Sequence, residues 1–438
     1  MISSAIARPL VLLLLSGLLA CGDDGGGAGG EGGGATVNEC KPVSGAGTEH
    51  ASITESETWT ADASPHIVTA DLSIPEGVTL TLEPCAEVRL QEGRSIHVEG
   101  GIVGKGTSAR PILVTAADAA PWSVLEVTDP GTISLAYTTV EGGGVEGTNA
   151  FAMIDTRGDQ LAPAAPTLDF DNVTIRNSAT YGISLRENAA FSSASRALTI
   201  TGSGQAPLRI LPRLATNIPD GDYTGNAIDR IVVENEVGGN IDVEDVTFPS
   251  RGVPYQIGGP ETLPELVVGP SAVTLTIEAG AELLFLAGGR LTADVDGATG
   301  GSISAIGTPD LPIVFASASD APMPGDWMGI WIEHVSSGTR FENVVIQYAG
   351  GPSFANSFHC EPDGSFSDED AAISFFAQPT SDMLTGSVIA DSPKIGVNLA
   401  YYGDPVDFLS ANEFSNIGKC KVSTPRPVEG VCPMIPCP

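Results

Sequence analysis

The chain carries two copies of one long sequence pattern, and this internal repeat limits its possible folds more than any other feature. The segment Val78–Val88 (VTLTLEPCAEV) matches Val273–Leu283 (VTLTIEAGAEL) without a gap. Further matches follow in the same order in both copies: Gly106-Thr107 with Gly307-Thr308, Pro111-Ile112 with Pro312-Ile313, Trp122 with Trp327, Leu135–Val140 with Phe341–Ile346, and Val173–Leu185 with Ser387–Leu399. Two halves of similar length, divided near residue 250, therefore repeat one design.

Each half consists of short strand-like runs. Runs of three to five residues, apolar at alternate positions and bounded by Gly, Pro, Asp or Asn, recur about every 20 residues, as at Leu80–Leu82, Ile112–Val114 and Val124–Val127. Such alternation indicates strands that turn one face inward. No stretch of about 12 residues in the mature chain has helical periodicity. Folds that join parallel strands through helices are therefore excluded.

Strands this short do not form stable hairpins, so we expect them to stack. In a solenoid each strand pairs in parallel with the strands above and below it, at about 4.8 Å per layer. The sequence thus predicts an all-β parallel β-helix of about 14 to 16 coils, with three strands per coil, over residues 65–418. We expect residues 65–250 and 251–418 to form its two halves, joined as one stack near Pro249–Pro254 because a break would expose raw strand edges.

Corner and interior positions can also be assigned. Three corners are predicted, because Asn and Asp tolerate the left-handed backbone conformation: Asn177-Ser178, Asp391-Ser392 and Asn412-x-Phe414. We expect Trp327 and Phe341 to fill the interior. One residue of the adjacent pair Tyr401-Tyr402 must face outward, because neighbouring residues of a strand point to opposite sides.

The order of these motifs resembles a known group of proteins. Thr-Leu-Thr-Ile-Glu-x-Gly, then Gly-Thr-x-x-x-Pro-Ile, then Trp-x-Gly-Ile at Trp327–Ile330, then Gly350-Gly351, is similar to right-handed parallel β-helix (pectin-lyase-like) proteins of bacterial cell surfaces. The pattern resembles most the large lipoprotein sets of myxobacteria. The resemblance covers residues 65–418 and implies a right-handed coil. It implies no single activity, because this fold hosts lyases, hydrolases and adhesins.

The N-terminus is typical of an exported lipoprotein. Residues 1–20 combine Arg8 with the apolar run Val11–Leu15, the pattern of a signal peptide. Leu18–Cys21 (LLAC) resembles the bacterial lipobox, which implies that Cys21 is the first mature residue and carries acyl chains. An Asp after this cysteine is the inner-membrane retention signal of enterobacteria. The residue here is Gly22, which favours the outer membrane or the cell surface.

Residues 21–36 are mostly Gly with a few acidic residues, so they cannot bury apolar surface. We expect a disordered, flexible tether between the lipid anchor and the folded part. The segments 37–64 and 419–438 would then cap the two ends of the solenoid.

Six further cysteines predict disulfides, because an exported chain meets oxidising conditions. They are Cys40, Cys85, Cys360, Cys420, Cys432 and Cys437. No close Cys-x-x-Cys pair occurs, which argues against a zinc site. We expect the pairs Cys40–Cys85, Cys360–Cys420 and Cys432–Cys437, the first supported because Cys85 replaces Gly280 of the second copy. Six cysteines allow about 15 connectivities, and the sequence does not select one.

The charge balance excludes some partners. Fifty-four acidic residues against 20 basic ones give a formal net charge of −34. This charge repels nucleic acid and argues against a polyanionic ligand unless a metal bridges the two. The acidic insertion His359–Asp370 offers Asp363, Asp368 and Asp370 as candidate Ca²⁺ ligands. Their spacing does not fit an EF-hand, and we favour a solvated acidic loop held by a Cys360 disulfide.

No catalytic residue is predicted. Trp331–His334 (WIEH) resembles the Trp-Ile-Asp-His signature of pectate lyases, but the Arg-x-Pro-x-x-Arg motif is missing and Arg209–Arg213 has another spacing. The Gly-His-Gly of polygalacturonases is also missing. We favour a noncatalytic surface lipoprotein with a scaffold, adhesion or glycan-binding role. A surface polysaccharide is a candidate binding partner. The alternatives are a carbohydrate-active enzyme, lyase or hydrolase, and a calcium-dependent interaction module.

Overall fold

The computed structural model describes residues 38–145, 151–159, 162–235, 240–259, 262, 264–293, 300–353 and 370–428. The chain divides into two units, Met1–Val37 and Asn38–Pro438, and the described residues belong to the second. Within these ranges the helical elements are three short 3-10 helices: η1 (Ala61–Ala63), η2 (Pro212–Asn217) and η4 (Ser381–Met383). No helix of the described residues is long and apolar enough to cross a membrane.

Two large sheets contain most of the strands. Sheet A has twelve: β1 (Thr48–His50), β2 (Glu57–Trp59), β3 (His66–Val68), β5 (Thr79–Leu82), β6 (Glu87–Leu90), β8 (Gly101–Lys105), β9 (Ile112–Ala116), β11 (Thr132–Glu141), β13 (Ala165–Arg176), β15 (Ala189–Phe191), β16 (Leu198–Thr201) and β18 (Gly221–Asp222). Sheet B has thirteen: β4 (Leu72–Ile74), β7 (Ile96–Val98), β10 (Leu125–Thr128), β12 (Ala152–Arg157), β14 (Tyr181–Leu185), β17 (Leu208–Ile210), β19 (Ile231–Val233), β21 (Tyr255–Ile257), β24 (Glu282–Phe285), β27 (Ile313–Ser317), β30 (Val344–Gln347), β33 (Val388–Ser392) and β35 (Glu413–Ile417).

Two smaller sheets belong to the second half. Sheet C consists of β22 (Glu265–Val268), β25 (Arg290–Ala293), β28 (Gly329–Ile332), β31 (Ala371–Phe375), β34 (Ile395–Leu399) and β36 (Cys420–Val422). Sheet D consists of β20 (Val246–Phe248), β23 (Thr274–Ile277), β26 (Ser302–Ile306), β29 (Arg340–Glu342) and β32 (Leu384–Thr385).

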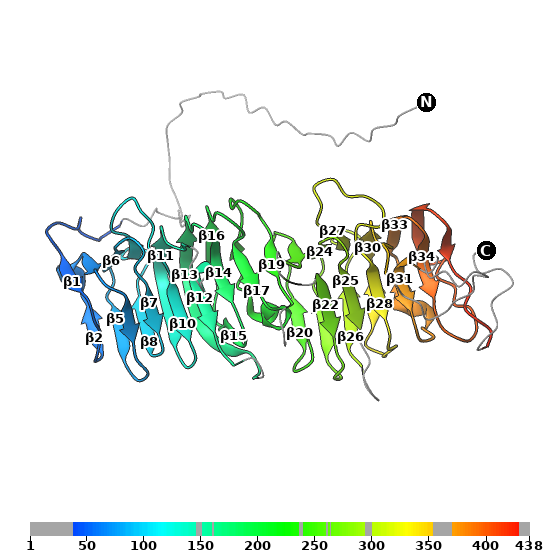
Figure 1. Ribbon diagram of the computed structural model, residues 1–438, viewed down its shortest axis with the longest axis horizontal. Coiled ribbons are helices and arrows are strands. Elements are labelled where there is room, and N and C mark those ends of the chain that lie inside the picture. Colours follow the sequence, from blue (N-terminus) through cyan, green and yellow to red (C-terminus); the bar gives the residue numbers. More distant parts are fainter. Residues whose placement is uncertain are drawn as a thin grey trace, which may run out of the picture. The chain divides into compact units, whose positions relative to one another are not determined.

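The connectivity is that of a stack of parallel strands (Figure 1). Along the chain β6, β7 and β8 follow one another, yet β6 pairs with β3 and β9, β7 with β4 and β10, and β8 with β5 and β11. Every pairing between the described strands is parallel. The predicted all-β fold with stacked parallel strands is confirmed, and the arrangement is consistent with a parallel β-solenoid.

Alternating side chains explain why these segments form strands. In β5, Leu80 and Leu82 are buried, whereas Thr79 and Thr81 are partly exposed. Inward side chains from all four sheets form one apolar core that extends from Ile53 to Val422. Each fully buried aliphatic side chain contributes about 1.5 to 3 kcal/mol, so this core offsets much of the entropy lost on folding.

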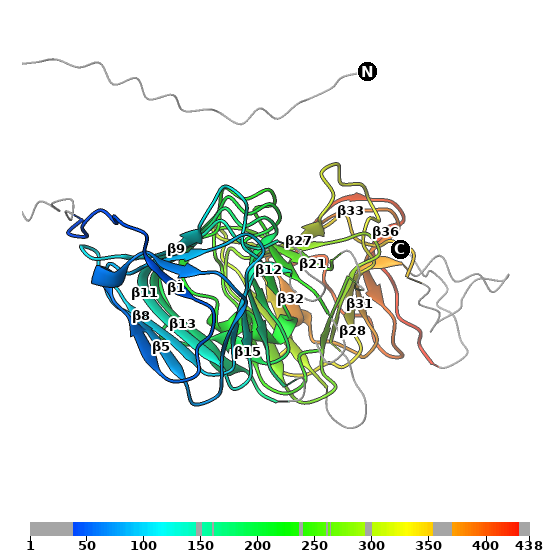
Figure 2. The same ribbon diagram turned by 60° about the vertical axis from the view of Figure 1, so that its left-hand side comes forward.

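Left-handed residues form the corners. The predicted corners at Asn177 and Asp391 are confirmed, with φ of +58° and +52°. The predicted corner at Asn412 is wrong, because the left-handed residue of that segment is Asn416, with φ of +50°, and the Asn412 side chain instead accepts a hydrogen bond from Ser387 N at 3.0 Å. The strands β11 and β13 are long because each bends around a corner, at Tyr137 (φ +45°) and Asn172 (φ +56°). Residues before Tyr137 pair with β8 and residues after it pair with β9, so sheet A has two arms. Figure 2 shows β5, β8, β11 and β13 side by side along one of these arms.

The predicted interior aromatic residues are also confirmed. Trp327 and Phe341 are fully buried, and so is Trp122, the equivalent of Trp327 in the first copy. The Trp122 indole donates to Glu141 O at 2.8 Å, and the Trp327 indole donates to Gln347 O at 2.9 Å. Of the final tyrosine pair, Tyr401 is buried and Tyr402 is 43 % exposed, as the alternation requires.

The two copies of the repeat do not occupy the same faces of the stack. Strand β6 of sheet A corresponds in sequence to β24 of sheet B, and β9 of sheet A corresponds to β27 of sheet B. Similarly, β14 of sheet B corresponds to β34 of sheet C. The second copy is therefore displaced by one face around the stack, and sheet B contains a different part of the repeat in each half.

Sheet B passes without interruption through the junction of the halves. Strand β17 pairs with β19, β19 with β21 and β21 with β24. The expected continuous stack is therefore present. At the two ends, β1 and β2 lie in the segment 37–64 and pair with β3 and β5, while β36 lies in the segment 419–438 and pairs with β34. Both segments that we assigned to caps thus contribute strands to the stack.

Candidate functional site

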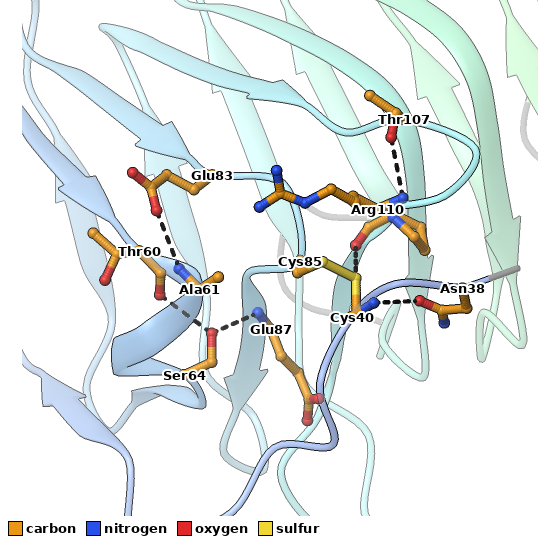
Figure 3. Close-up of a disulfide and its surroundings, with 11 residues drawn as sticks. Asn38, Cys40, Thr60, Ala61, Ser64, Glu83, Cys85, Glu87, Thr107 and Arg110 are labelled. Carbon is orange, nitrogen blue, oxygen red and sulfur yellow. Dashed lines mark hydrogen bonds between the residues drawn. A yellow bond between two sulfur atoms is a disulfide. The ribbon is translucent and has the colours of Figure 1, made fainter.

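The predicted disulfide between Cys40 and Cys85 is present (Figure 3). The Cα atoms lie 5.3 Å apart, and Glu39 N donates to Ala109 O at 2.8 Å beside the bridge. Cys85 has φ of +71° and its repeat equivalent Gly280 has φ of +79°, so both occupy the same left-handed turn. Closing a loop of 45 residues stabilises the fold by about 4 kcal/mol in the chain-entropy model.

The remaining predicted cysteine sites are less fully described. Cys420 is disulfide-bonded, and its partner lies outside the described residues. Cys21, Cys360, Cys432 and Cys437 also lie outside them. The lipidation of Cys21 and the pairs Cys360–Cys420 and Cys432–Cys437 therefore stay predictions.

Of the three candidate calcium ligands, Asp370 is described, whereas Asp363 and Asp368 lie outside the described residues. The Asp370 carboxylate is buried and accepts hydrogen bonds from Ser353 N at 2.9 Å and Ser353 Oγ at 2.7 Å. Lys394 Nζ donates to its second oxygen at 2.9 Å. Asp370 thus holds Ser353, so the described residues on the two sides of segment 354–369 are hydrogen-bonded to each other. In the part of the chain that the structure describes, no group of three or more His, Cys, Asp or Glu side chains is arranged to hold a metal.

The segment that resembles the lyase signature continues β28 on the outer face of sheet C. Trp331 is partly exposed there, with the Arg290 guanidinium 4.7 Å from its ring centroid. Phe376 contacts the edge of this ring at 5.6 Å between centroids. Arg290 also donates to the Glu265 carboxylate from the neighbouring strand. These four side chains combine an aromatic surface with an ion pair, and we call them the Trp331 platform.

A row of polar side chains crosses sheet B in the first half, and the sequence analysis did not predict it. The strand register aligns His97, Glu126, Asp155, Ser184 and Arg209, one from each of five adjacent strands. We call these five residues the sheet B row. Its local signal is a polar residue between two buried aliphatic ones, as in the triplets 96–98, 125–127, 183–185 and 208–210. The triplets become one row only when the strands stack.

The sheet B row is held by ion pairs at both ends. His97 Nδ1 lies 2.7 Å from Glu126 Oε2, and Arg157 Nε lies 3.2 Å from the other oxygen of Glu126. At the far end Arg209 donates through two nitrogens to Glu234 Oε2, at 3.0 and 2.6 Å. The His97 side chain is 46 % exposed, whereas Arg209 and Glu234 are buried. The row therefore runs from solvent into the protein.

The centre of the row is a fully buried acid. Asp155 Oδ2 accepts a hydrogen bond from Phe151 N at 3.0 Å, while its Oδ1 has no hydrogen-bond partner. The aligned Ser184 Oγ is also buried without a partner. Burial raises the pKa of Asp155 from 3.8 to about 6, against the opposing effects of the Phe151 N–H and nearby arginines. Perturbed acids of this kind are common at functional sites.

A second apolar cluster explains why these outward-facing residues are buried. Ala152, Tyr181, Ala206 and Val232 pack together on the outside of sheet B, with the partly buried Phe151 against them. The guanidinium of Arg209 lies 4.8 Å from the Phe151 ring centroid. Phe151 also donates its N–H to Asp155, so the cluster adjoins the centre of the row, and burial of this carboxylate is the main cause of its raised pKa.

Chemically, the buried centre of the row contains an acid that titrates near neutrality beside several guanidinium groups. A general acid needs such a pKa, but it must also reach a substrate atom within hydrogen-bond distance. Asp155 has no exposed surface in the described structure. The Trp331 platform is the opposite case, because its rings are partly exposed. The chain matches no family model, and no curated protein and no solved structure is significantly similar to it.

Proposed function

We propose that this protein is a lipid-anchored, noncatalytic scaffold of the outer membrane or cell surface that binds glycan on one side of a right-handed parallel β-helix. In this proposal Cys21 carries the lipid, residues 21–36 form the tether, and residues 65–418 form about 14 to 16 coils of a pectin-lyase-like solenoid. The polysaccharide contacts the side of the solenoid rather than a deep active site.

The continuity of sheet B and of the core is the observation that carries this proposal. One apolar core extends through both halves of the repeat, and the thirteen parallel strands of sheet B are stacked continuously through the junction. A stack of this kind is rigid along its axis, since every strand is held by the layers on both sides. Such a scaffold suits the display of a binding surface at a distance from a membrane.

The Trp331 platform is the surface that fits a neutral glycan. The face of an aromatic ring packs against the C–H groups of a sugar, and charged side chains form strong hydrogen bonds with hydroxyl groups. Trp331 and Phe376 offer rings, and Arg290 and Glu265 offer a donor and an acceptor beside them. The net charge of −34 favours an uncharged polymer over a polyanion.

A glycan array probed with the wild-type chain and with Trp331→Ala tests this function. We expect binding to a neutral polysaccharide, without a need for calcium, that falls about fivefold or more in the variant. The stacking of a nucleic acid base on an aromatic ring contributes about 1 to 3 kcal/mol, and we expect a similar contribution from a sugar ring. Tyr137→Asn is the matched control. It removes another partly exposed aromatic residue and installs the residue that the second copy has at the equivalent position, Asn343. Equal loss in both variants, or no glycan binding at all, would contradict the proposal.

Membrane attachment needs a separate test. We expect the wild-type chain to fractionate with membranes and Cys21→Ser to remain soluble. Continued membrane association of the variant would remove the lipid anchor from the proposal.

A carbohydrate-active enzyme is the second candidate, and the raised pKa of Asp155 favours it. Absorbance assays on polygalacturonate and alginate, with and without calcium, compare the wild-type chain with Asp155→Asn. We expect no product from either protein, because Asp155 is fully buried. Product formation that disappears in the variant would replace the scaffold proposal with a lyase or hydrolase.

A further inference from the structure

Three rings from β1, β2 and β3 pack against one another at the N-terminal end of the core. His50 ends β1, Trp59 ends β2 and His66 begins β3. The centroids of His50 and Trp59 lie 4.1 Å apart, and those of Trp59 and His66 lie 5.1 Å apart with nearly parallel rings. Each ring has an aliphatic register partner on the strand that follows in the stack: Val68 for His50, Leu82 for Trp59 and Val88 for His66. We call the three rings the His–Trp–His plug.

A chain of hydrogen bonds fixes which nitrogen of each imidazole carries a proton. His66 Nε2 lies 2.9 Å from Thr60 O, a carbonyl that can only accept, so His66 is protonated at Nε2. In neutral His66 the other nitrogen, Nδ1, is then an acceptor. It lies 3.0 Å from His50 Nε2, which must therefore be the donor. One pair of neutral tautomers satisfies the whole chain.

This arrangement accepts one extra proton but not two. Protonation of His50 Nδ1 leaves every hydrogen bond intact. This nitrogen lies 4.0 Å from Glu57 Oε1, which can balance the positive charge. A second proton has to be added to His66 Nδ1, the atom that accepts from His50. Two N–H groups and two positive charges would then oppose each other at 3.0 Å.

The charged groups around the plug do not offset a second proton. Glu57 on β2 is the acid that acts on both imidazoles, and its carboxylate already accepts from the Trp59 indole at 2.9 Å. Glu49 of β1 and Asp62 of η1 are exposed. In the layer below, Glu87 and Arg89 of β6 pair with each other, and β5 contains no titratable residue.

We propose that β1 and β2 form an acid-released cap, which stays closed with one proton on the His–Trp–His plug and detaches when both imidazoles are charged. Both strands have only three residues and, among the described strands, each pairs on one side alone, β1 with β3 and β2 with β5. Detachment exposes the edges of β3 and β5. The Cys40–Cys85 bridge keeps the cap attached, so it closes again when the protons leave.

The direction of the pH effect follows from burial. Burial, and for His50 also the neighbouring imidazole, lowers the pKa of both histidines below 6.5. The open cap therefore binds more protons than the closed cap at acidic pH, and the cap loses stability as the pH falls below about 6.5. Each proton that the closed state excludes raises the opening constant about 30-fold between pH 7.5 and 5.0.

Hydrogen exchange of the full chain, followed by mass spectrometry at pH 7.5 and 5.0 and corrected for intrinsic exchange, tests the proposal. We expect the opening constant of peptides within residues 48–68 to rise about 30-fold or more at pH 5.0 while core peptides stay protected. The variant His50→Gln/His66→Gln should lose this pH dependence. His97→Gln should retain it, because His97 is a partly exposed histidine on sheet B, away from the plug.

A titration of the wild-type histidines by NMR keeps the test independent of whether the double variant folds. We expect His50 and His66 to titrate in two steps, and the loss of protection in residues 48–68 to follow the second step. Unchanged protection at pH 5.0, or full protonation of both imidazoles in a closed cap, would overturn the proposal.

Discussion

Replacing the buried acid of the sheet B row tests whether its environment has the polarity that the structure indicates. Asp155 is fully buried, and its pKa of about 6 lies roughly 2 units above that of an exposed aspartate. Each unit corresponds to about 1.4 kcal/mol, so keeping Asp155 ionised at pH 7.5 costs the folded state about 3 kcal/mol. We expect Asp155→Asn to stabilise the protein by about that amount at pH 7.5.

The amide of the variant suits the contacts that are present. Its oxygen can still accept from Phe151 N, and its NH₂ group takes the place of Oδ1, which accepts no hydrogen bond in the wild-type structure. The substitution therefore removes the buried charge and keeps the hydrogen bond from Phe151 N. The exposed Asp310 supplies the control, because Asp310→Asn removes the same charge without removing a buried acid.

The sign of the pH dependence distinguishes this explanation from a general effect of charge. The folded state holds a proton on Asp155 up to about pH 6, whereas the unfolded chain loses it near pH 3.8. The wild-type stability that depends on Asp155 is thus complete below pH 3.8 and is lost as the pH rises through 6. The advantage of the variant should be about 3 kcal/mol at pH 7.5 and close to zero at pH 4.

Calorimetry at the two pH values measures this difference. With about 2 cal/mol/K of unfolding entropy per residue, 3 kcal/mol corresponds to a rise in Tm of about 4 °C for a unit of this size. A variant that is equally stable or less stable than the wild type at pH 7.5 would refute the reasoning. So would an advantage of the same size at pH 4, or an equal gain in Asp310→Asn.

Three other sets of substitutions test the stack itself. Cys40→Ser/Cys85→Gly removes the bridge and places at the turn the glycine that the second copy has there, Gly280. We expect about 4 kcal/mol less stability, with faster proteolysis confined to the N-terminal strands. Trp122→Phe and Trp327→Phe should each lower the free energy of unfolding by about 1 to 3 kcal/mol in denaturant, because each removes one indole hydrogen bond to a backbone carbonyl. A large loss of stability in one variant alone would contradict the equivalence of the two copies. Asn343→Ala should lower the free energy of unfolding by about 1 to 2 kcal/mol, because alanine is strained at the φ of +50° that this residue has, and Asn343→Gly should lower it less. The reverse order in the same assay would contradict the corner assignment.

The sequence by itself determined the local properties of this protein. Alternating apolar residues, as in β5, specify a strand with one buried face, and the lack of helical periodicity specifies that such strands stack on one another. Asn177 and Asp391 were recognisable as corners because few residue types accept a positive φ. The replacement of Gly280 by Cys85 at a turn indicated the bridge to Cys40 before any distance was known.

The tertiary structure decided which strands became neighbours. An alternating pattern fixes whether a side chain points inward or outward, but it does not fix the face of the stack on which its strand lies. Hence the sequence did not reveal that the second copy is displaced by one face, or that His97, Asp155 and Arg209 align in one row. It likewise left His50 and His66 as two isolated residues. Their shared hydrogen bond exists because β1 and β3 meet in register, and that register depends on the packing of the whole end of the stack.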